Sequence, residues 1–149
     1  MKRTILLADD DASIRTMVGR LLESENYDVL LAADGNETAS AFLNCRPDLV
    51  LLDLNMPKRD GWETIHLLRS MAPLVPVIVI TARPNQHEEA MRRRIDALME
   101  KPLDLPLLLQ AIQDLLAESD EARLARVRDS NFETTRLCRD TPLDAGRRS

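Results

Sequence analysis

Short apolar runs alternate with longer amphipathic segments from the N-terminus to about residue 117. The runs are continuous in Val, Ile and Leu, which is typical of strands whose two faces are both buried in a parallel sheet. They cover Thr4–Ala8, Tyr27–Ala32, Asp48–Leu52 and Val75–Ile80, with a weaker fifth candidate at Ala97–Met99. The pattern therefore predicts five short buried strands.

The segments between these runs carry apolar residues at helical spacing. One stripe follows the i, i+3, i+4, i+7 and i+8 positions of a single helix face, and a second lies within Leu105–Leu116. The first stripe consists of Ile14, Met17, Val18, Leu21 and Leu22. Weaker patterns predict helices that begin near Asp34-Gly35, that follow Gly61, and that cover Gln86–Arg94. Five successive strand–helix units predict an α/β fold, a (βα)5 doubly wound parallel sheet.

The pattern changes after Ala117. Residues 118–149 contain seven acidic residues and seven arginines, few large apolar residues and no clear strand pattern. Glu121–Val127 could prolong the last helix, whereas Thr141–Ser149 has the composition of a loose segment. We therefore predict a domain over residues 1–117 and a charged C-terminal extension over residues 118–149, partly helical or disordered.

Composition narrows the class of protein. With 149 residues, 44% of them hydrophobic and 30% charged, the chain fits one globular domain of ordinary size. The formal net charge of −5 argues against broad electrostatic attraction to nucleic acid or to anionic membranes. The extension is also too short for a typical DNA-binding domain, and its arginines are balanced by acids. We expect protein–protein output and no direct nucleic-acid binding by this chain.

Targeting signals and cysteines favour a cytoplasmic location. The N-terminus lacks the apolar length of a secretory signal, and no run approaches the ~20 residues needed to span a bilayer. Cys45 and Cys138 are the only cysteines, too few and too distant to indicate a disulfide framework or a thiolate metal site. We expect a soluble protein of the reducing cytosol, without membrane partners.

Polar residues with catalytic potential follow four of the predicted strands. Asp9 and Asp10 follow the first strand, Asp53 the third, Thr81 the fourth and Lys101 the fifth. In open α/β sheets the carboxyl ends of the strands meet at one edge, so the fold should gather these side chains. The neighbouring Asp11 is interpreted as a helix cap rather than as a metal ligand.

These residue types suit phosphoryl transfer to a carboxylate. Clustered carboxylates repel one another, and a shared Mg²⁺, which prefers oxygen ligands, relieves the repulsion. Asp10 and Asp53 could bind the metal directly, and Asp9 directly or through water. An aspartate such as Asp53 can attack phosphorus when the added charge is neutralised, here by Mg²⁺, Lys101 and the Thr81 hydroxyl.

Five segments in register resemble the receiver domain of two-component response regulators, the CheY-like superfamily. They are Ile5-Leu6-Leu7-Ala8-Asp9-Asp10-Asp11, Leu51-Leu52-Asp53-Leu54-Asn55-Met56-Pro57, Asp60-Gly61, Val79-Ile80-Thr81-Ala82 and Glu100-Lys101-Pro102. The resemblance covers about residues 3–117. It implies a flavodoxin-like sheet with strand order 2-1-3-4-5.

The resemblance also implies roles for single residues. Asp53 would accept a phosphoryl group from a histidine kinase or a histidine phosphotransfer protein. Asp9, Asp10, Asp53 and the backbone carbonyl of Asn55 would hold Mg²⁺. Thr81 would hydrogen-bond the phosphoryl group, and Lys101, followed by a cis bond to Pro102, would pair with it.

Output would pass through the surface formed by the helix at 86–94, the strand at 97–99 and the helix at 105–116, which partners read in this family. A homodimer is compatible with this picture. The chain would be a switch whose only catalysis is its own phosphorylation and dephosphorylation. Leu98 departs from the pattern, because the family usually carries Tyr or Phe three residues before the lysine; a leucine has no ring to reorient.

Two other functions are compatible with parts of the sequence. A phosphohydrolase of the haloacid-dehalogenase type also uses a strand-end aspartate with Mg²⁺, but it expects a second aspartate where Asn55 stands. Leu98 and the extension instead suggest a receiver-like interaction module that is never phosphorylated. His66 and His87 are interpreted as ordinary surface or partly buried residues.

Overall fold

A single parallel sheet forms the centre of the molecule. The structure, a computed structural model, describes residues 2–138. The strands are β1 (Thr4–Ala8), β2 (Asp28–Ala32), β3 (Leu49–Asp53), β4 (Val77–Thr81), β5 (Ala97–Glu100) and β6 (Thr135–Arg136). They lie in the order β2-β1-β3-β4-β5-β6, and every neighbouring pair is parallel. The expected order of the first five strands is confirmed.

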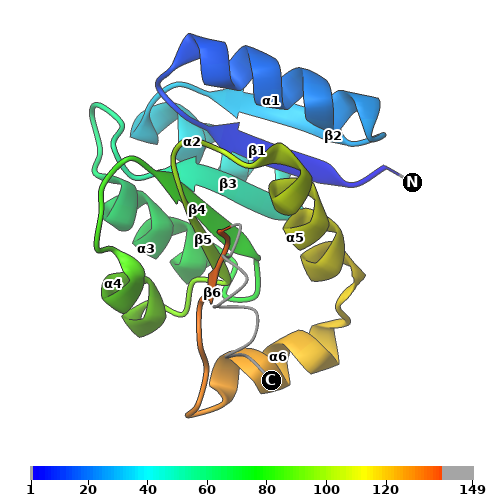
Figure 1. Cartoon of the computed structure of the whole chain (residues 1–149), viewed down its shortest axis with the longest axis vertical. Coiled ribbons are helices and arrows are strands. Elements are labelled where there is room, and N and C mark those ends of the chain that lie inside the picture. The colour runs from blue at the N-terminus through cyan, green and yellow to red at the C-terminus, as the bar shows by residue number, and fades with distance from the viewer. Residues whose placement is uncertain (1, 139–149) are drawn as a thin grey trace.

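Helices cover both faces of this sheet (Figure 1). The helices of the described residues are α1 (Ala12–Ser24), α2 (Gly35–Cys45), α3 (Gly61–Met71), α4 (His87–Arg92), α5 (Leu105–Ala117) and α6 (Asp120–Arg128), of which the first five cover the sheet. Buried residues of α2, α3 and α4 share one core with one side of the strands, whereas α1 and α5 share a second core with the other side. The doubly wound arrangement is therefore confirmed.

Burial explains why the strands read as continuous apolar runs. Every residue of β3 and of β4 is buried, and adjacent residues of each strand point into opposite cores. In β3, for example, Val50 and Leu52 face the core under α2 and α3, and Leu49 and Leu51 face the core under α1 and α5. A strand covered on both sides has no solvent face on which polar residues would alternate.

The extension differs from its prediction. Helix α6 confirms the helical pattern at 121–127, although Glu118 ends α5 and Ser119 caps a separate helix by accepting a hydrogen bond from Ala122 N at 3.1 Å. The chain then returns to the sheet and adds β6 beside β5. The expectation of a five-stranded sheet without a strand in the extension was wrong, because the two residues of β6 take their backbone partners from β5 and need no apolar run of their own. The loose segment expected at 141–149 lies outside the described residues.

Candidate phosphoacceptor and metal site

The parallel register of the sheet gathers the candidate residues at one edge. Asp53 is the last residue of β3 and Thr81 the last of β4, while Asp9 follows β1 directly and Lys101 follows β5. The strands pair in step, with Asp53 opposite Ile80 and Thr81 opposite Glu100, so that their carboxyl ends are level. Residues far apart in the sequence therefore meet at the edge that open α/β sheets use for ligands.

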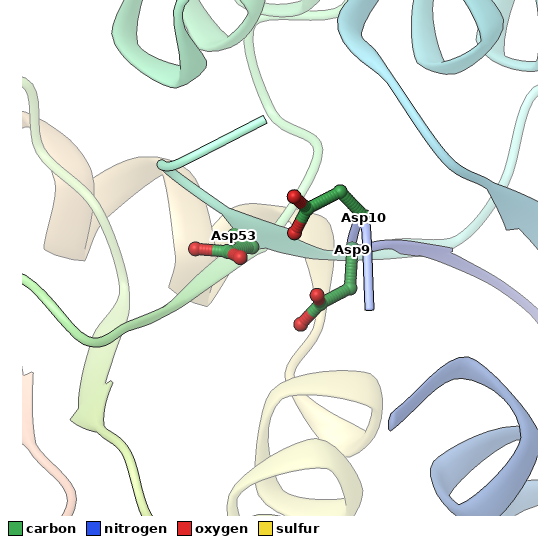
Figure 2. Close-up of side chains that lie close together, drawn as sticks. All are labelled: Asp9, Asp10 and Asp53. Carbon is green, nitrogen blue, oxygen red and sulfur yellow. The ribbon is translucent and has the colours of Figure 1, made fainter. Parts of the chain in front are cut away.

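Three carboxylates form the centre of the site (Figure 2). One carboxylate oxygen from each of Asp9, Asp10 and Asp53 lies within 4.8 Å of the other two. Asp9 and Asp53 are buried, whereas Asp10 is exposed. Asp9 Oδ1 accepts a hydrogen bond from the backbone of Asp11 at 2.9 Å, and Asp53 Oδ1 accepts one from Asn55 at 3.0 Å. These backbone donors orient the two buried carboxylates.

Lys101 faces the two buried carboxylates. Its Nζ lies 3.0 Å from Asp9 Oδ2 and 3.2 Å from Asp53 Oδ2. Burial lowers the pKa of the Lys101 ammonium, but the ion pair with Asp9 and the charge of Asp53 outweigh burial and raise the pKa overall. Lys101 therefore stays charged at neutral pH and supplies a fixed cation beside Asp53.

Burial acts in the opposite direction on Asp9. Desolvation raises the pKa of its carboxyl group, and the negative charge of Asp53 adds to this, although Asp11 N and Lys101 partly compensate. Asp9 Oδ2 is buried and accepts no hydrogen bond of regular geometry. A carboxylate in these surroundings gains from a further cation.

The residues present fit Mg²⁺. The donor set consists of carboxylate oxygens from Asp9, Asp10 and Asp53, and the buried Asp9 Oδ2 lacks a regular donor. Hard oxygen ligands of this kind match the preference of Mg²⁺, and the exposure of Asp10 leaves room for the waters that this ion retains. That the backbone carbonyl of Asn55 is a further Mg²⁺ ligand stays a prediction.

Thr81 is fully buried at the end of β4, and its Oγ1 accepts a hydrogen bond from Arg83 N at 2.9 Å. Arg83 then reaches across to the loop after β3, where its Nη2 lies 3.3 Å from Asn55 Oδ1 and 3.5 Å from Asp60 Oδ1. Arg83 thus ties together the loops that follow Asp53 and Thr81. Sequence reasoning missed Arg83, because a single basic residue in a loop carries no periodic signal.

Several smaller predictions can also be compared with the structure. Asp11 caps α1 by accepting from Ser13 N at 2.8 Å, as its interpretation as a helix cap requires. The peptide bond between Lys101 and Pro102 is cis, as the resemblance implied. Leu98 is buried in the core beneath α3 and α4, so it sits as a packed aliphatic side chain. His66 is exposed, whereas His87 contacts the extension.

Comparison with known proteins shows the family to which the chain belongs. Residues 5–113 match the model of the response regulator receiver domain family. The chain is 39% identical over 114 residues to the response regulator MprA of Mycobacterium sp. (strain KMS). This match covers 75% of the chain and 50% of that relative. It is 32% identical over 124 residues to the alkaline phosphatase synthesis transcriptional regulatory protein PhoP of Bacillus subtilis (strain 168), covering 82% and 52% respectively. The chain thus spans about half the length of the curated relatives that it matches.

Solved structures give the same result. A CheY-like response regulator receiver domain protein from Methanospirillum hungatei JF-1 superposes with a TM-score of 0.76 at 27% identity, covering 81% of this chain and 98% of the other. A chain of the CheX–CheY–BeF3–Mg²⁺ complex from Borrelia burgdorferi superposes with a TM-score of 0.73 at 25% identity. The match covers 78% of this chain and 90% of the other. The chain belongs to the response regulator receiver domain family, whose members are signalling switches of two-component systems.

These findings do not favour the haloacid-dehalogenase alternative. Asn55 occupies the place of the expected second aspartate, and a side-chain amide has no acidic proton with which to protonate a leaving group. Its side chain instead accepts from Arg83. Within residues 2–138, no helix combines the length and apolar character needed to cross a bilayer.

Proposed function

We propose that Asp53 accepts a phosphoryl group from a histidine kinase or a histidine phosphotransfer protein, and that the chain then alters its contacts with protein partners. The observation that carries this proposal is the position of Lys101 Nζ, 3.2 Å from Asp53 Oδ2, within the three-carboxylate cluster. A nucleophilic carboxylate beside a fixed cation and a cation-binding set of oxygens is the arrangement that acyl phosphate formation requires.

The transfer is an in-line displacement at phosphorus. A carboxylate oxygen of Asp53 forms the new O–P bond, the bond from phosphorus to the donor atom breaks, and the donor keeps that electron pair. Lys101 pairs with the transferred group, whose charge it partly neutralises. The Thr81 hydroxyl, which now accepts from Arg83 N, has its own proton to donate to a phosphoryl oxygen.

Asp9, Asp10, Asp53 and the Asn55 carbonyl would hold Mg²⁺, which supplies further charge neutralisation at the phosphoryl oxygens. Attack of water on phosphorus would release inorganic phosphate and restore Asp53. We propose that both steps are catalysed by this site alone, so that the chain acts as a switch and does not turn over a separate substrate.

The proposed output surface is narrower than expected from the sequence. The surface formed by α4, β5 and α5 is part of the proposal, but β6 occupies the free edge of β5. A downstream protein target must therefore bind beside β6 or displace it. A cytoplasmic location, protein–protein output without direct nucleic-acid binding, and a homodimer also stay proposals, since the chain spans about half of its relatives.

The test is phosphorylation in vitro with acetyl phosphate and Mg²⁺, followed by intact mass. We expect one added phosphoryl group of ~80 Da that hydroxylamine removes, as it does from acyl phosphates. Asp53→Asn should gain no mass. Asp60→Asn is the matched control, because Asp60 lies in the same loop outside the carboxylate cluster and Asn is also a good helix cap.

Two results would contradict the proposal. One is an unchanged mass of the wild-type chain under these conditions, which would favour an interaction module that is not phosphorylated. The other is an equal gain in mass by Asp53→Asn, which would move the acceptor elsewhere. Phosphotransfer profiling against purified kinases from the same source would then identify the donor.

A further inference from the structure

The extension is attached to the sheet by two parts of different strength. Helix α6 lies at the amino ends of β4 and β5, opposite the carboxylate site, and β6 lies along the edge of β5 (Figure 1). A short segment, residues 129–134, joins them. The two attachments meet at Asp96, whose side chain binds α6 and whose backbone carbonyl accepts from Thr135 N, but only the second pairs along β5 and contacts α4.

The first attachment is a buried ion cluster. Arg123 and Asp96 are both almost fully buried, and two guanidinium nitrogens of Arg123 lie 2.6 and 3.0 Å from the two Asp96 oxygens. Arg123 also donates to the backbone of Leu74 and, at 3.1 Å, of Val75. Arg126 adds a bond of 2.8 Å to Asp96. Charged hydrogen bonds away from water are among the strong ones, so α6 is firmly held.

The second attachment is short and lies at the edge of the sheet. Strand β6 has two residues, both exposed, and its backbone is held by Thr135 N to Asp96 O at 3.0 Å and Leu137 N to Leu98 O at 2.8 Å. The Thr134 hydroxyl adds a bond of 2.7 Å to Ile95 O. Leu137 is buried, and the part of the chain nearest α6 is held more firmly, because Arg94 Nη1 donates to Asp129 O at 2.8 Å and the buried Phe132 ring lies against the guanidinium groups of Arg94 and Arg126. The segment 134–137, in contrast, is held by few neutral hydrogen bonds. It is the part of the extension that can loosen while α6 stays in place.

This weaker part contacts both elements that lead from the site. The first is β5, which runs directly into Lys101. The second is α4, whose first residue His87 places Nε2 3.1 Å from Thr134 O. The loop before His87 begins at Thr81, and its Arg83 N is bound to Thr81 Oγ1 at 2.9 Å. A continuous set of contacts therefore joins the proposed phosphoryl site to β6.

We propose that residues 134–137 are an intramolecular ligand of the surface formed by the β5 edge and His87, and that phosphoryl transfer to Asp53 weakens their binding. The inference rests on the proposed function. A phosphoryl group that binds Thr81 and Lys101 draws on the Thr81 hydroxyl and so alters the hydrogen bond that Thr81 Oγ1 accepts from Arg83 N; the loop that leads to His87 then responds. The surface that β6 vacates accepts an extended segment of a partner, through the same backbone groups of β5.

Hydrogen exchange of the full chain tests this inference. The Thr135 and Leu137 amides are measured with and without acetyl phosphate and Mg²⁺, and the intact mass of the same samples reports phosphorylation. Couplings between protein sites are typically 5- to 150-fold, so we expect these amides to exchange about 5- to 150-fold faster in the phosphorylated chain. The helical amides of α6 should not change, and neither should any of these amides in Asp53→Asn.

The mass and the exchange rate separate the two ways of failing. A gain of ~80 Da with unchanged exchange at Thr135 and Leu137 would overturn this inference and leave the proposed function intact. No gain in mass would overturn both. Equal acceleration in α6 would also overturn it, because the whole extension would then have been released.

A pair of histidine variants tests the route. His87→Ala removes the contact with Thr134 O, while His66→Ala removes the other histidine, which is exposed on α3. Both variants should gain the phosphoryl mass. His87→Ala should show faster β6 exchange before phosphorylation and a smaller further change after it, whereas His66→Ala should match the wild type. A wild-type response in His87→Ala would refute transmission through His87.

Discussion

Replacing Arg123 with methionine tests whether the extension is an integral part of the fold. Methionine keeps an unbranched apolar side chain of similar reach and removes the guanidinium. Arg123 is 3% exposed, and its guanidinium contacts Asp96, Leu74 O and Val75 O. Removing one partner of a buried ion pair destabilises proteins by about 3–5 kcal/mol.

The lower end of that range applies here, because Asp96 keeps other partners. Arg126 Nη2 lies 2.8 Å from its Oδ1, and Val77 N donates to its Oδ2 at 2.8 Å. We expect the free energy of unfolding to fall by about 3 kcal/mol. With an unfolding entropy of about 0.3 kcal/mol/K for a chain of this length, Tm should fall by roughly 10 °C.

Urea denaturation measures this change, with the fluorescence of Trp62, the only tryptophan, as one probe and circular dichroism as the other. Arg128→Met is the matched control, because Arg128 is an exposed residue of the same helix and should shift stability by less than about 0.5 kcal/mol. A loss below about 1 kcal/mol in Arg123→Met would refute the reasoning. Equal losses in the two variants would show that helix propensity, and not the ion cluster, is responsible.

Three further predictions concern pH, metal and backbone packing. Burial raises the pKa of the Asp96 carboxyl, but the hydrogen bonds and charge of Arg123 outweigh burial and lower the pKa overall. The stability that ionised Asp96 contributes is therefore present above about pH 4 and is lost as pH falls further. In urea titrations from about pH 6 to about pH 3, Asp96→Asn should lose less unfolding free energy on acidification than the wild type. Mg²⁺ should stabilise the wild-type chain by about 2.7 kcal/mol at a hundred times its Kd, and clearly less in Asp10→Asn, in thermal melts with and without the ion. Gly61→Ala should cost about 1–3 kcal/mol in urea, since its Cβ would meet the Leu54 backbone, whereas Gly19→Ala, with its nearest neighbour at 3.6 Å, should be neutral or stabilising.

The candidate site could be predicted from the sequence because each of its residues follows or ends a short apolar run that marks a strand. Asp53 and Thr81 each end an apolar run, and the parallel sheet brings such ends together whatever lies between them. The apolar runs do not predict how each side chain is oriented. That Lys101 Nζ lies between Asp9 and Asp53, and that Arg83 joins two loops, follows from loop geometry, which has no periodic signature.

The extension shows where sequence reasoning stops. Its arginines read as a solvated, balanced set of charges, and an isolated arginine carries no mark of burial. Arg123 is buried because Asp96, 27 residues earlier, is itself buried and needs a cation. Neither residue, taken alone in the sequence, indicates that the Arg123–Asp96 pair is buried, since a buried charge is tolerated only when its partner is in place.

The sequence by itself determined the five strand–helix units, the order in which chemistry follows the strands, and the family resemblance that the comparisons confirmed. These features depend on residue type and short-range period, which the chain carries without folding. The tertiary structure decided the sixth strand, the anchoring of α6 and the contact between His87 and Thr134. The sequence does not reveal these features because each depends on a hydrogen-bonding partner that lies far away along the chain and comes close only after folding.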